Sequence, residues 1–237
     1  MEYSVEEIGS VRCRIWTHGQ GGPVIYWGTA HEQGRGEHVA SLMADYLRET
    51  PWTLAAYEAE NWNRDYSPWA LPSVKGEAEF TGGARATLAW LTDMCIPHIE
   101  SSLLCGASSR MIGGYSLAGL FSLFAFYESR IFDGVASCSG SLWYPGWKEY
   151  ADGQSSPKGS FAYLSLGRKE EKTRSRKLAI VGDMTRWQHE QMQQDSNVRS
   201  SELYWHNGGH FAHVDQRIAQ GFAWLIKRAE WRDQSGD

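Results

Sequence analysis

Short apolar runs alternate along the chain with segments of helical periodicity, and this alternation constrains the fold more than any other feature. The apolar runs are bounded by glycine, proline and polar residues, which is typical of buried strands. Strands that alternate with helices pair in parallel through right-handed crossovers, and strands covered by helices on both faces are apolar throughout. The sequence therefore predicts an α/β protein with a mostly parallel, doubly wound sheet and helices on both faces. The predicted strands are residues 23–28, 52–57, 110–115, 134–139, 161–166 and 202–205, preceded by a β-ribbon over residues 3–18.

The helical segments differ in how much of their surface is apolar. Residues 117–127 are apolar on nearly all sides and predict a buried helix. An earlier amphipathic helix is predicted from apolar residues that recur at the spacing of one helix face, namely Val39, Leu42, Met43, Tyr46 and Leu47. The other predicted helices are residues 84–99 with a kink near Pro97, residues 173–193, and a last helix whose apolar face holds Phe211, Val214, Ile218, Phe222 and Leu225.

Composition limits the class of protein. The chain has 237 residues, of which 42% are hydrophobic and 22% charged, and its net charge is −5. These values are typical of a folded globular protein, and the length fits one domain over residues 1–237. This length leaves little room for a large cap domain, so we expect a fairly open cleft. The pI near 5.9 provides no basic surface for nucleic acid, which we exclude as a partner.

The expected location is the cytoplasm. The first residues are acidic and lack the positive and apolar regions of a signal peptide. No apolar run approaches the ~20 residues that cross a bilayer, so we expect no membrane partner. The four cysteines form no C-x-x-C pair and are expected to be free thiols in a reducing compartment. They are Cys13, Cys95, Cys105 and Cys138.

The strongest chemical signal is Ser116, which lies where a predicted strand runs directly into a helix. A strained turn at such a junction lifts a serine hydroxyl above the sheet and requires small residues around it. Gly114, Ala118 and Gly119 meet that requirement, although the usual G-x-S-x-G pattern has glycine in place of Ala118. The backbone N–H of Leu117, at the helix start, would face a developing oxyanion. We interpret Ser116 as a nucleophile; the alternative is a serine in a glycine-rich turn with no catalytic role.

A serine nucleophile needs a base, and His210 is the predicted one. It follows the last strand and the pair Gly208-Gly209, which allows the chain to turn there. His206 and His213 fit packing or surface roles better. The three histidines could suggest a metal site, but no carboxylate completes the set locally, so we expect no metal.

The acid that orients the base is predicted just beyond the strand at 161–166. Glu170 is favoured over Glu171 because of its position in the loop, and Asp183 is disfavoured because it lies within the predicted helix. Arg168, Lys169 and Lys172 surround the two glutamates, so a merely solvated, charged loop is the alternative interpretation.

Aromatic residues gather in the loops at the predicted active edge. Trp62, Trp69 and Trp143 are predicted to line a substrate pocket for an apolar or aromatic group, and each could instead anchor its own loop. Asn61 can add a polar contact, whereas Asp65 is expected to pair with Arg64. Further aromatic residues in or beside these loops are Trp27, Tyr144 and Trp147.

Four segments resemble the putative-esterase family of α/β-hydrolases, which includes enterochelin-esterase-like proteins, S-formylglutathione hydrolases and mycolyltransferases. They are residues 113–120, 135–143, 164–170 and 207–211, and the resemblance extends from about Pro23 to about Ile226. It implies a single-domain α/β-hydrolase fold. It also implies that Ser116 is the nucleophile, His210 the base and Glu170 the acid. The second oxyanion donor would be the backbone N–H of Thr29, after the strand at 23–28.

The predicted function is hydrolysis of carboxylic esters through an acyl-enzyme intermediate, with a Ser-Glu-His triad and no cofactor. The expected partner is a small-molecule ester. Two alternatives remain open: an acyltransferase that uses the same triad, and a binding protein that keeps the fold without the activity.

Overall fold

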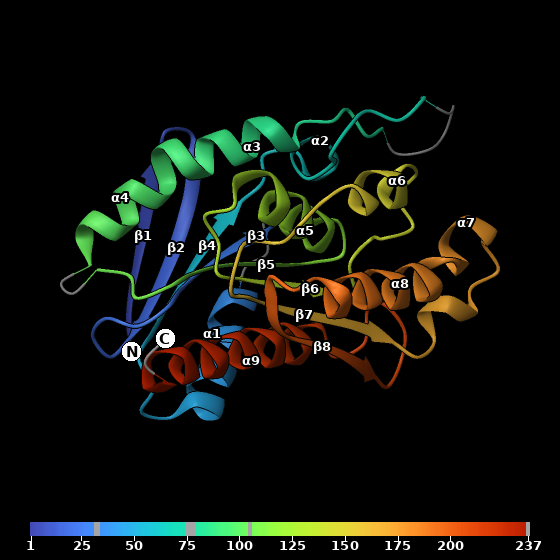
Figure 1. Ribbon diagram of the computed structural model, residues 1–237. Coiled ribbons are helices and arrows are strands. Elements are labelled where there is room, and N and C mark those ends of the chain that lie inside the picture. Colours follow the sequence, from blue (N-terminus) through green and yellow to red (C-terminus); the bar gives the residue numbers. More distant parts are fainter. Residues whose placement is uncertain (31–33, 74–78, 104–105, 236–237) are drawn as a thin grey trace.

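The computed structural model describes residues 1–30, 34–73, 79–103 and 106–235, and the side chains of the last helix as far as Ala229. Within these residues eight strands form one sheet in the order β1-β2-β4-β3-β5-β6-β7-β8 (Figure 1). The first three strands of that order pair antiparallel: β1 (Glu2–Ile8), β2 (Val11–His18) and β4 (Trp52–Glu58). The parallel part continues from β4 through β3 (Val24–Thr29), β5 (Arg110–Tyr115), β6 (Gly134–Cys138), β7 (Ser160–Gly167) and β8 (Val198–His206). The predicted α/β class and the mostly parallel sheet are confirmed.

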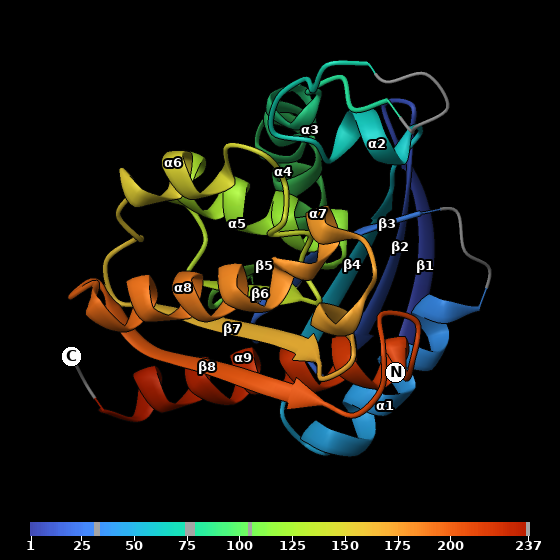
Figure 2. The ribbon, with the colours of Figure 1, turned by 90° about the vertical axis from the view of Figure 1, so that its right-hand side faces the viewer.

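Helices cover both faces of the sheet, as Figure 2 shows. On one face α1 (Arg35–Leu47) and α9 (Val214–Ser235) pack against each other. The apolar side chains divide into two buried clusters, one between α1, α9 and the sheet and one on the opposite face. The helices of the opposite face are α3 (Ala84–Trp90), α4 (Ile96–Ser102), α5 (Leu117–Ser129), α6 (Trp147–Asp152) and α8 (Val181–Gln194).

Helix α5 lies at the centre of that second layer. From Leu117 to Tyr127 every side chain is buried, which agrees with the sequence prediction of a helix that is apolar all round. The Ser122 hydroxyl in this stretch donates to the Ala118 carbonyl at 2.7 Å, and the Tyr127 hydroxyl accepts from Gln188 at 2.8 Å, so both buried hydroxyls of α5 are paired. The helix is therefore a rigid support for the turn at its start.

The long helix predicted over residues 173–193 is wrong as one element. A 3-10 turn, η2 (Glu170–Lys172), is followed by the short helix α7 (Arg176–Ala179) and then by α8. Thr173 and Ser175, between η2 and α7, are extended. Residues 168–177 hold no apolar side chain, so a helix there would have no face to bury.

Two smaller differences concern helix ends. Phe211 was predicted on the buried face of the last helix, but α9 begins at Val214 and Phe211 is 91% exposed. The interruption predicted near Pro97 is a π-helical turn, η1 (Leu91–Cys95), one turn earlier, and Pro97 lies in the first turn of α4, where its missing N–H is not needed. The sequence prediction also missed α6 and the short helix α2 (Trp62–Asp65).

Of the four cysteines, Cys13, Cys95 and Cys138 are free and buried, and Cys105 lies outside the described residues. Across the described parts of the chain, no helix combines the length and apolar character that crossing a membrane requires.

The burial of α5 predicts a large stability difference between two phenylalanines. Replacing the fully buried Phe126 with alanine should lower the free energy of unfolding by about 3–5 kcal/mol, because it leaves a cavity in the core. Replacing the exposed Phe211 with alanine is the matched control and should change it by less than about 0.5 kcal/mol. Urea unfolding measures both; similar losses in the two variants would contradict this burial pattern.

Candidate active site

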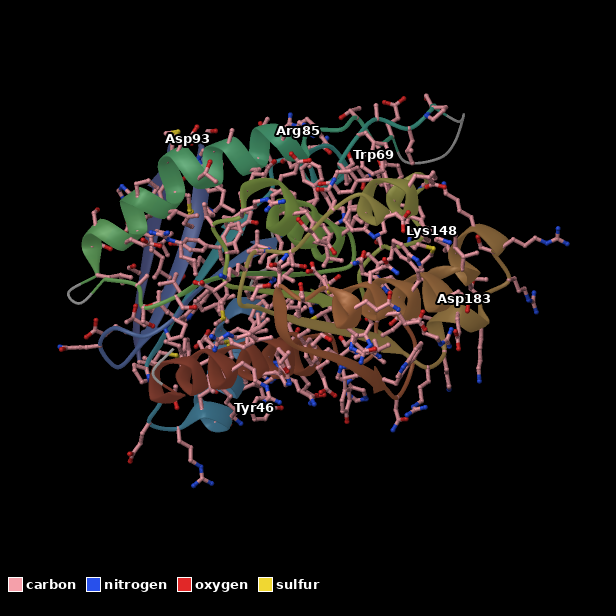
Figure 3. The ribbon with its side chains drawn as sticks, viewed as in Figure 1. Tyr46, Trp69, Arg85, Asp93, Lys148 and Asp183 are labelled. Atoms are coloured by element: carbon pink, nitrogen blue, oxygen red, sulfur yellow. The ribbon has the colours of Figure 1, made fainter. Side chains whose placement is uncertain are left out.

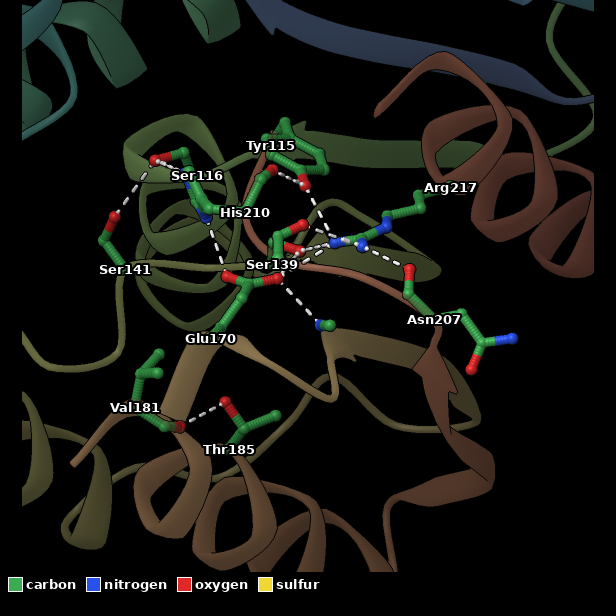
Figure 4. A network of polar contacts seen from close by, with 12 residues as sticks. Tyr115, Ser116, Ser139, Ser141, Glu170, Val181, Thr185, Asn207, His210 and Arg217 are labelled. Atoms are coloured by element: carbon green, nitrogen blue, oxygen red, sulfur yellow. Dashed lines mark hydrogen bonds and ion pairs between the residues drawn. The ribbon is translucent and has the colours of Figure 1, made fainter. Parts of the chain in front are cut away.

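The carboxyl ends of the parallel strands bring distant residues to one edge of the sheet, where ligands of such sheets bind. Ser116 follows β5, Ser139 follows β6, Glu170 follows β7 and His210 follows β8. Figure 4 shows these four side chains in one hydrogen-bonded network. The predicted loops therefore meet in space.

The backbone of Ser116 has φ 58° and ψ −121°, a conformation that L-residues rarely adopt and that costs about 1–3 kcal/mol. The turn is held by its own backbone: the Ser116 N–H donates to the Cys138 carbonyl at 3.0 Å, and its carbonyl accepts from Leu120 at 3.1 Å and from Ser141 at 3.0 Å. The hydroxyl is thereby fixed above the sheet at the N-terminus of α5.

The small residues around Ser116 are required by close packing. A Cβ atom on Gly114 would lie 2.4 Å from the Ala118 carbonyl oxygen and 2.8 Å from its methyl carbon. Gly119 is also tight, with the Gly114 carbonyl oxygen and the Cα atom of Gly140 each 3.1 Å from a would-be Cβ. Ala118 itself is fully buried without disturbing the turn. The departure from G-x-S-x-G therefore leaves the geometry intact.

A continuous chain of hydrogen bonds joins Ser116, His210 and Glu170. The Ser116 hydroxyl lies 3.0 Å from His210 Nε2, and His210 Nδ1 lies 2.7 Å from Glu170 Oε2. Because an ionised carboxylate only accepts, Nδ1 carries the proton in the neutral imidazole and Nε2 accepts from the serine hydroxyl. This is the arrangement that allows Nε2 to remove a proton from Ser116.

Glu170 is held in its charged form. Burial alone would raise the pKa of this carboxyl, but His210, the Gly167 N–H at 2.7 Å and the Ser139 hydroxyl at 2.8 Å outweigh it, and the pKa lies below the ordinary value. The charged carboxylate can therefore balance a positive imidazolium beside it.

Arg217, on α9, completes the network and was not predicted from the sequence. Its side chain is fully buried, and Nη1 donates to Glu170 Oε1 at 2.9 Å and to Ser139 Oγ at 3.0 Å. Nη2 donates to the carbonyls of Asn207 at 3.2 Å and Gly209 at 3.0 Å, in the loop that carries His210. One guanidinium thus holds both the acid and the loop of the base. The sequence does contain a sign that Arg217 is buried, because it lies three residues after Val214 and so falls on the apolar face of the last helix.

Tyr115 links the strand before the nucleophile to the histidine. Its hydroxyl donates to the His210 carbonyl at 2.6 Å and accepts from Arg217 Nη1 at 3.1 Å. Burial raises the pKa of Tyr115 to about 12, although Ser139 and Arg217 act in the opposite direction, so the phenol stays protonated at neutral pH. The backbone of His210 is therefore tethered from two sides.

The alternative acids and histidines lie outside the hydrogen-bonded chain. Glu171 Oε2 accepts from Arg186 at 2.8 Å, and Asp183 accepts from the same arginine at 2.9 Å. Burial lowers the pKa of His206 to about 4, with Arg217 as the next cause, and its ring lies 4.7 Å from that of Tyr204. His213 precedes α9. The described residues contain no group of three or more His, Cys, Asp or Glu that could hold a metal ion.

Two cavities flank Ser116 and His210, and Phe211 lines both. The first, which we call the Trp27 cavity, has a volume of about 280 Å³. Its other lining residues are Trp27, Gly28, Thr29, Ala30, Arg35, Trp62, Tyr115, Val214 and Ile218. The second, the Trp143 cavity, has a volume of about 370 Å³. Its other lining residues are Ser139, Gly140, Ser141, Trp143, Lys169, Glu170, Thr173, Leu178 and Val181.

The predicted pocket residues divide between the cavities and the packed loops. Trp62 lines the Trp27 cavity and Trp143 lines the other. Trp69 lines neither: its indole N–H donates to the Pro145 carbonyl at 2.9 Å, its ring packs on Tyr144 and Tyr150, and Figure 3 shows it between α2 and α6. Trp69 is partly buried, and these contacts anchor its loop, which is the alternative role that the sequence allowed for it.

Other predicted residues have equally clear surroundings. Tyr144 and Trp147 are buried in the core. Asn61 accepts from the Arg64 N–H at 3.0 Å at the start of α2, and Asp65 pairs with Arg64 at 2.6 Å. Leu117 is the first residue of α5, and Thr29 ends β3 and lines the same cavity as Ser116. The two predicted oxyanion donors thus come from segments beside the serine.

A model of the putative esterase family matches residues 10–218 of the chain. The chain belongs to this family. It is accordingly a carboxylic ester hydrolase. No curated protein matches the sequence.

Solved structures of hydrolases share the fold at low sequence identity. An IroE-like serine hydrolase from Shewanella oneidensis is 18% identical with a TM-score of 0.80, over 95% of this chain and 80% of that one. The siderophore hydrolase EstA from Aspergillus nidulans is 15% identical with a TM-score of 0.73, over 92% and 90%. The enterobactin esterase FES from Shigella flexneri is 17% identical with a TM-score of 0.66, over 100% and 60%.

The five hydrogen bonds of Arg217 predict a severe effect of Arg217→Met. The change leaves the buried Glu170 carboxylate without its arginine partner and should lower the free energy of unfolding by about 3–5 kcal/mol. Arg228→Met is the matched control, because Arg228 lies on the same helix but packs over the Trp224 ring and should cost little. Chemical denaturation compares the two; equal, small losses would show that the network contributes nothing.

The lowered pKa of Glu170 predicts a pH-dependent share of stability. A carboxyl whose pKa is lower in the folded protein stabilises it above the unfolded value, here near 4.5, and loses that contribution as the pH falls through the folded value. The difference in free energy of unfolding between wild type and Glu170→Gln should therefore be largest near neutral pH. It should shrink as the pH falls below the unfolded pKa of about 4.5. Denaturation across an acidic pH series measures it, and a constant difference would refute the expectation.

Proposed function

We propose that Ser116, His210 and Glu170 hydrolyse carboxylic esters through an acyl-enzyme intermediate. The observation that carries this proposal is the continuous chain from the Ser116 hydroxyl through both nitrogens of His210 to Glu170, at 3.0 and 2.7 Å. The strained backbone of Ser116 and its place at the start of α5 support it further.

In the first half-reaction Ser116 Oγ bonds to the ester carbonyl carbon, and its proton moves to His210 Nε2. Glu170 balances the positive charge of the imidazolium. The negative charge that develops on the carbonyl oxygen would face the N–H groups of Leu117 and Thr29, and the dipole of α5 adds to this stabilisation. The bond to the alcohol oxygen then breaks, and Nε2 returns the proton to that oxygen.

In the second half-reaction a water molecule takes the place of the alcohol. Its oxygen bonds to the acyl carbon while His210 Nε2 accepts its proton. When the bond to Ser116 breaks, the proton returns to Oγ and the carboxylic acid leaves. Every proton that moves in this cycle passes through one nitrogen, so the position of His210 decides the rate of both halves.

The cavities support esters with an apolar or aromatic group. Trp27, Trp62, Val214 and Ile218 form a largely apolar wall on one side of Ser116. Esters of the siderophore type belong in the substrate panel, because EstA is a siderophore hydrolase and FES an enterobactin esterase.

The test combines activity with covalent labelling. Ser116→Ala and His210→Ala should each lower kcat on p-nitrophenyl esters by about 10⁴-fold or more, since either change removes the nucleophilic unit. A fluorophosphonate should label Ser116 in the wild type only, as read by peptide mass spectrometry. Ser129→Ala, on the same helix but at its far end, is the control and should keep full activity.

Undiminished hydrolysis by Ser116→Ala would end the proposal. Product analysis with a competing alcohol separates water from an alcohol as the acceptor, and recovery of mainly the new ester would replace hydrolysis with acyl transfer.

A further inference from the structure

The two cavities beside Ser116 differ in electrostatic character. Among the described residues that line the Trp27 cavity, Arg35 is the one with a charged side chain, and its guanidinium pairs with Asp215 at 2.5 Å. Asp215 also contacts His38 at 2.8 Å. The rest of that wall is mainly aromatic and aliphatic. This cavity therefore favours an uncharged group.

The Trp143 cavity contains Lys169 and Glu170. The Glu170 carboxylate is 4% exposed, and its two oxygens are occupied by Arg217 and His210, so its charge is compensated within the network. Lys169 is different, because its side chain is exposed at the cavity wall. Among the described residues that line this cavity, the uncompensated charge is therefore positive.

A basic segment adjoins the same cavity. Residues 168–177 contain six lysines or arginines and two glutamates, in a chain whose net charge is −5. One glutamate is Glu170, and the other, Glu171, accepts from Arg186 at 2.8 Å. The six basic side chains are exposed, and the segment buries no apolar residue of its own. A concentration of one charge at the mouth of a cleft raises the local concentration of oppositely charged ligands.

The aromatic wall of the cavity connects to this segment. The ammonium group of Lys177 lies 5.3 Å from the centre of the Trp143 ring, which itself lines the cavity. Lys169 thus lines the Trp143 cavity itself, while Lys177, in α7, contacts a ring of the cavity wall.

We propose that the Trp143 cavity binds a part of the ester substrate that carries a carboxylate, phosphate or sulfate, with Lys169 as its contact, while an uncharged part occupies the Trp27 cavity. This inference rests on the proposed esterase function of Ser116. The two ends of one substrate would therefore lie in the two cavities on either side of Ser116.

Two matched pairs of esters test the proposal and show which end carries the charge. For the alcohol side the pair is 4-acetoxybenzoate and the neutral 4-acetoxybenzamide; for the acyl side it is the p-nitrophenyl monoester of succinate and the neutral p-nitrophenyl levulinate. In at least one pair, Lys169→Gln should lower kcat/KM for the anionic ester by about 3- to 10-fold more than for its neutral partner, mainly through KM. Comparing the variant with wild type on each ester cancels differences in intrinsic reactivity.

Lys158→Gln is the control of equal charge change. Lys158 is exposed and precedes β7, at the sheet edge opposite the site, so it should leave both pairs unchanged. Added salt should slow the anionic ester and spare the neutral one in the wild type, because ions screen an exposed charge over about 10 Å at 0.1 M.

The outcomes separate this inference from the proposed function. Hydrolysis of all four esters with equal responses to Lys169→Gln would overturn the anion-binding cavity and leave the esterase mechanism standing. Equal losses of kcat/KM for the anionic ester in Lys169→Gln and Lys158→Gln would also overturn it, since they would reflect the net charge of the protein and not a contact in the cavity. Absence of hydrolysis together with absence of fluorophosphonate labelling at Ser116 would defeat the esterase mechanism itself.

Discussion

One buried guanidinium determines how the candidate active site is assembled. Arg217 is fully buried, and it bonds to the acid, to the serine after β6 and to the loop that carries the histidine. A charge in the core is costly unless it is paired, and here the carboxylate of Glu170 and two backbone carbonyls accept from the two terminal nitrogens of the guanidinium. Because its partners, Tyr115 included, come from four separate segments, the arginine links the carboxyl ends of four neighbouring strands in one geometry.

The same logic of mutual support applies to the nucleophile. The unusual backbone at Ser116 persists because the sheet and α5 hold both of its peptide groups, and because Gly114 and Gly119 allow strand and helix to approach closely. The helix that bears this strain is the most deeply buried one on its face of the sheet. The packed core thereby fixes the position of the Ser116 hydroxyl at the surface of the cleft.

The sequence predicted the strands closely because buried strands are short apolar runs, and the loops after them follow from the topology of a parallel sheet. Ser116, Glu170 and His210 lie in such loops, and the structure brings the three side chains together; their catalytic roles stay a proposal. The position of Arg217 on the apolar face of the last helix indicates burial, but its role could not be predicted, because its partners lie far away in the sequence. The helix predicted over residues 173–193 is interrupted because the segment 168–177 has no apolar side chain to bury. Trp69 could not be told from a pocket residue without knowing which rings surround it.

Phe211 has a consequence for how the cleft responds to occupancy. Its ring is 91% exposed, borders both cavities and stands edge-on to His210 with the ring centres 5.1 Å apart. An apolar ring in water beside the base is uncovered only while the cleft is empty. A molecule that spans the two cavities must pass over it and dehydrate it, so association should carry a negative change in heat capacity. The empty enzyme thus keeps, at its centre, a patch of surface that only a spanning ligand can shield from solvent.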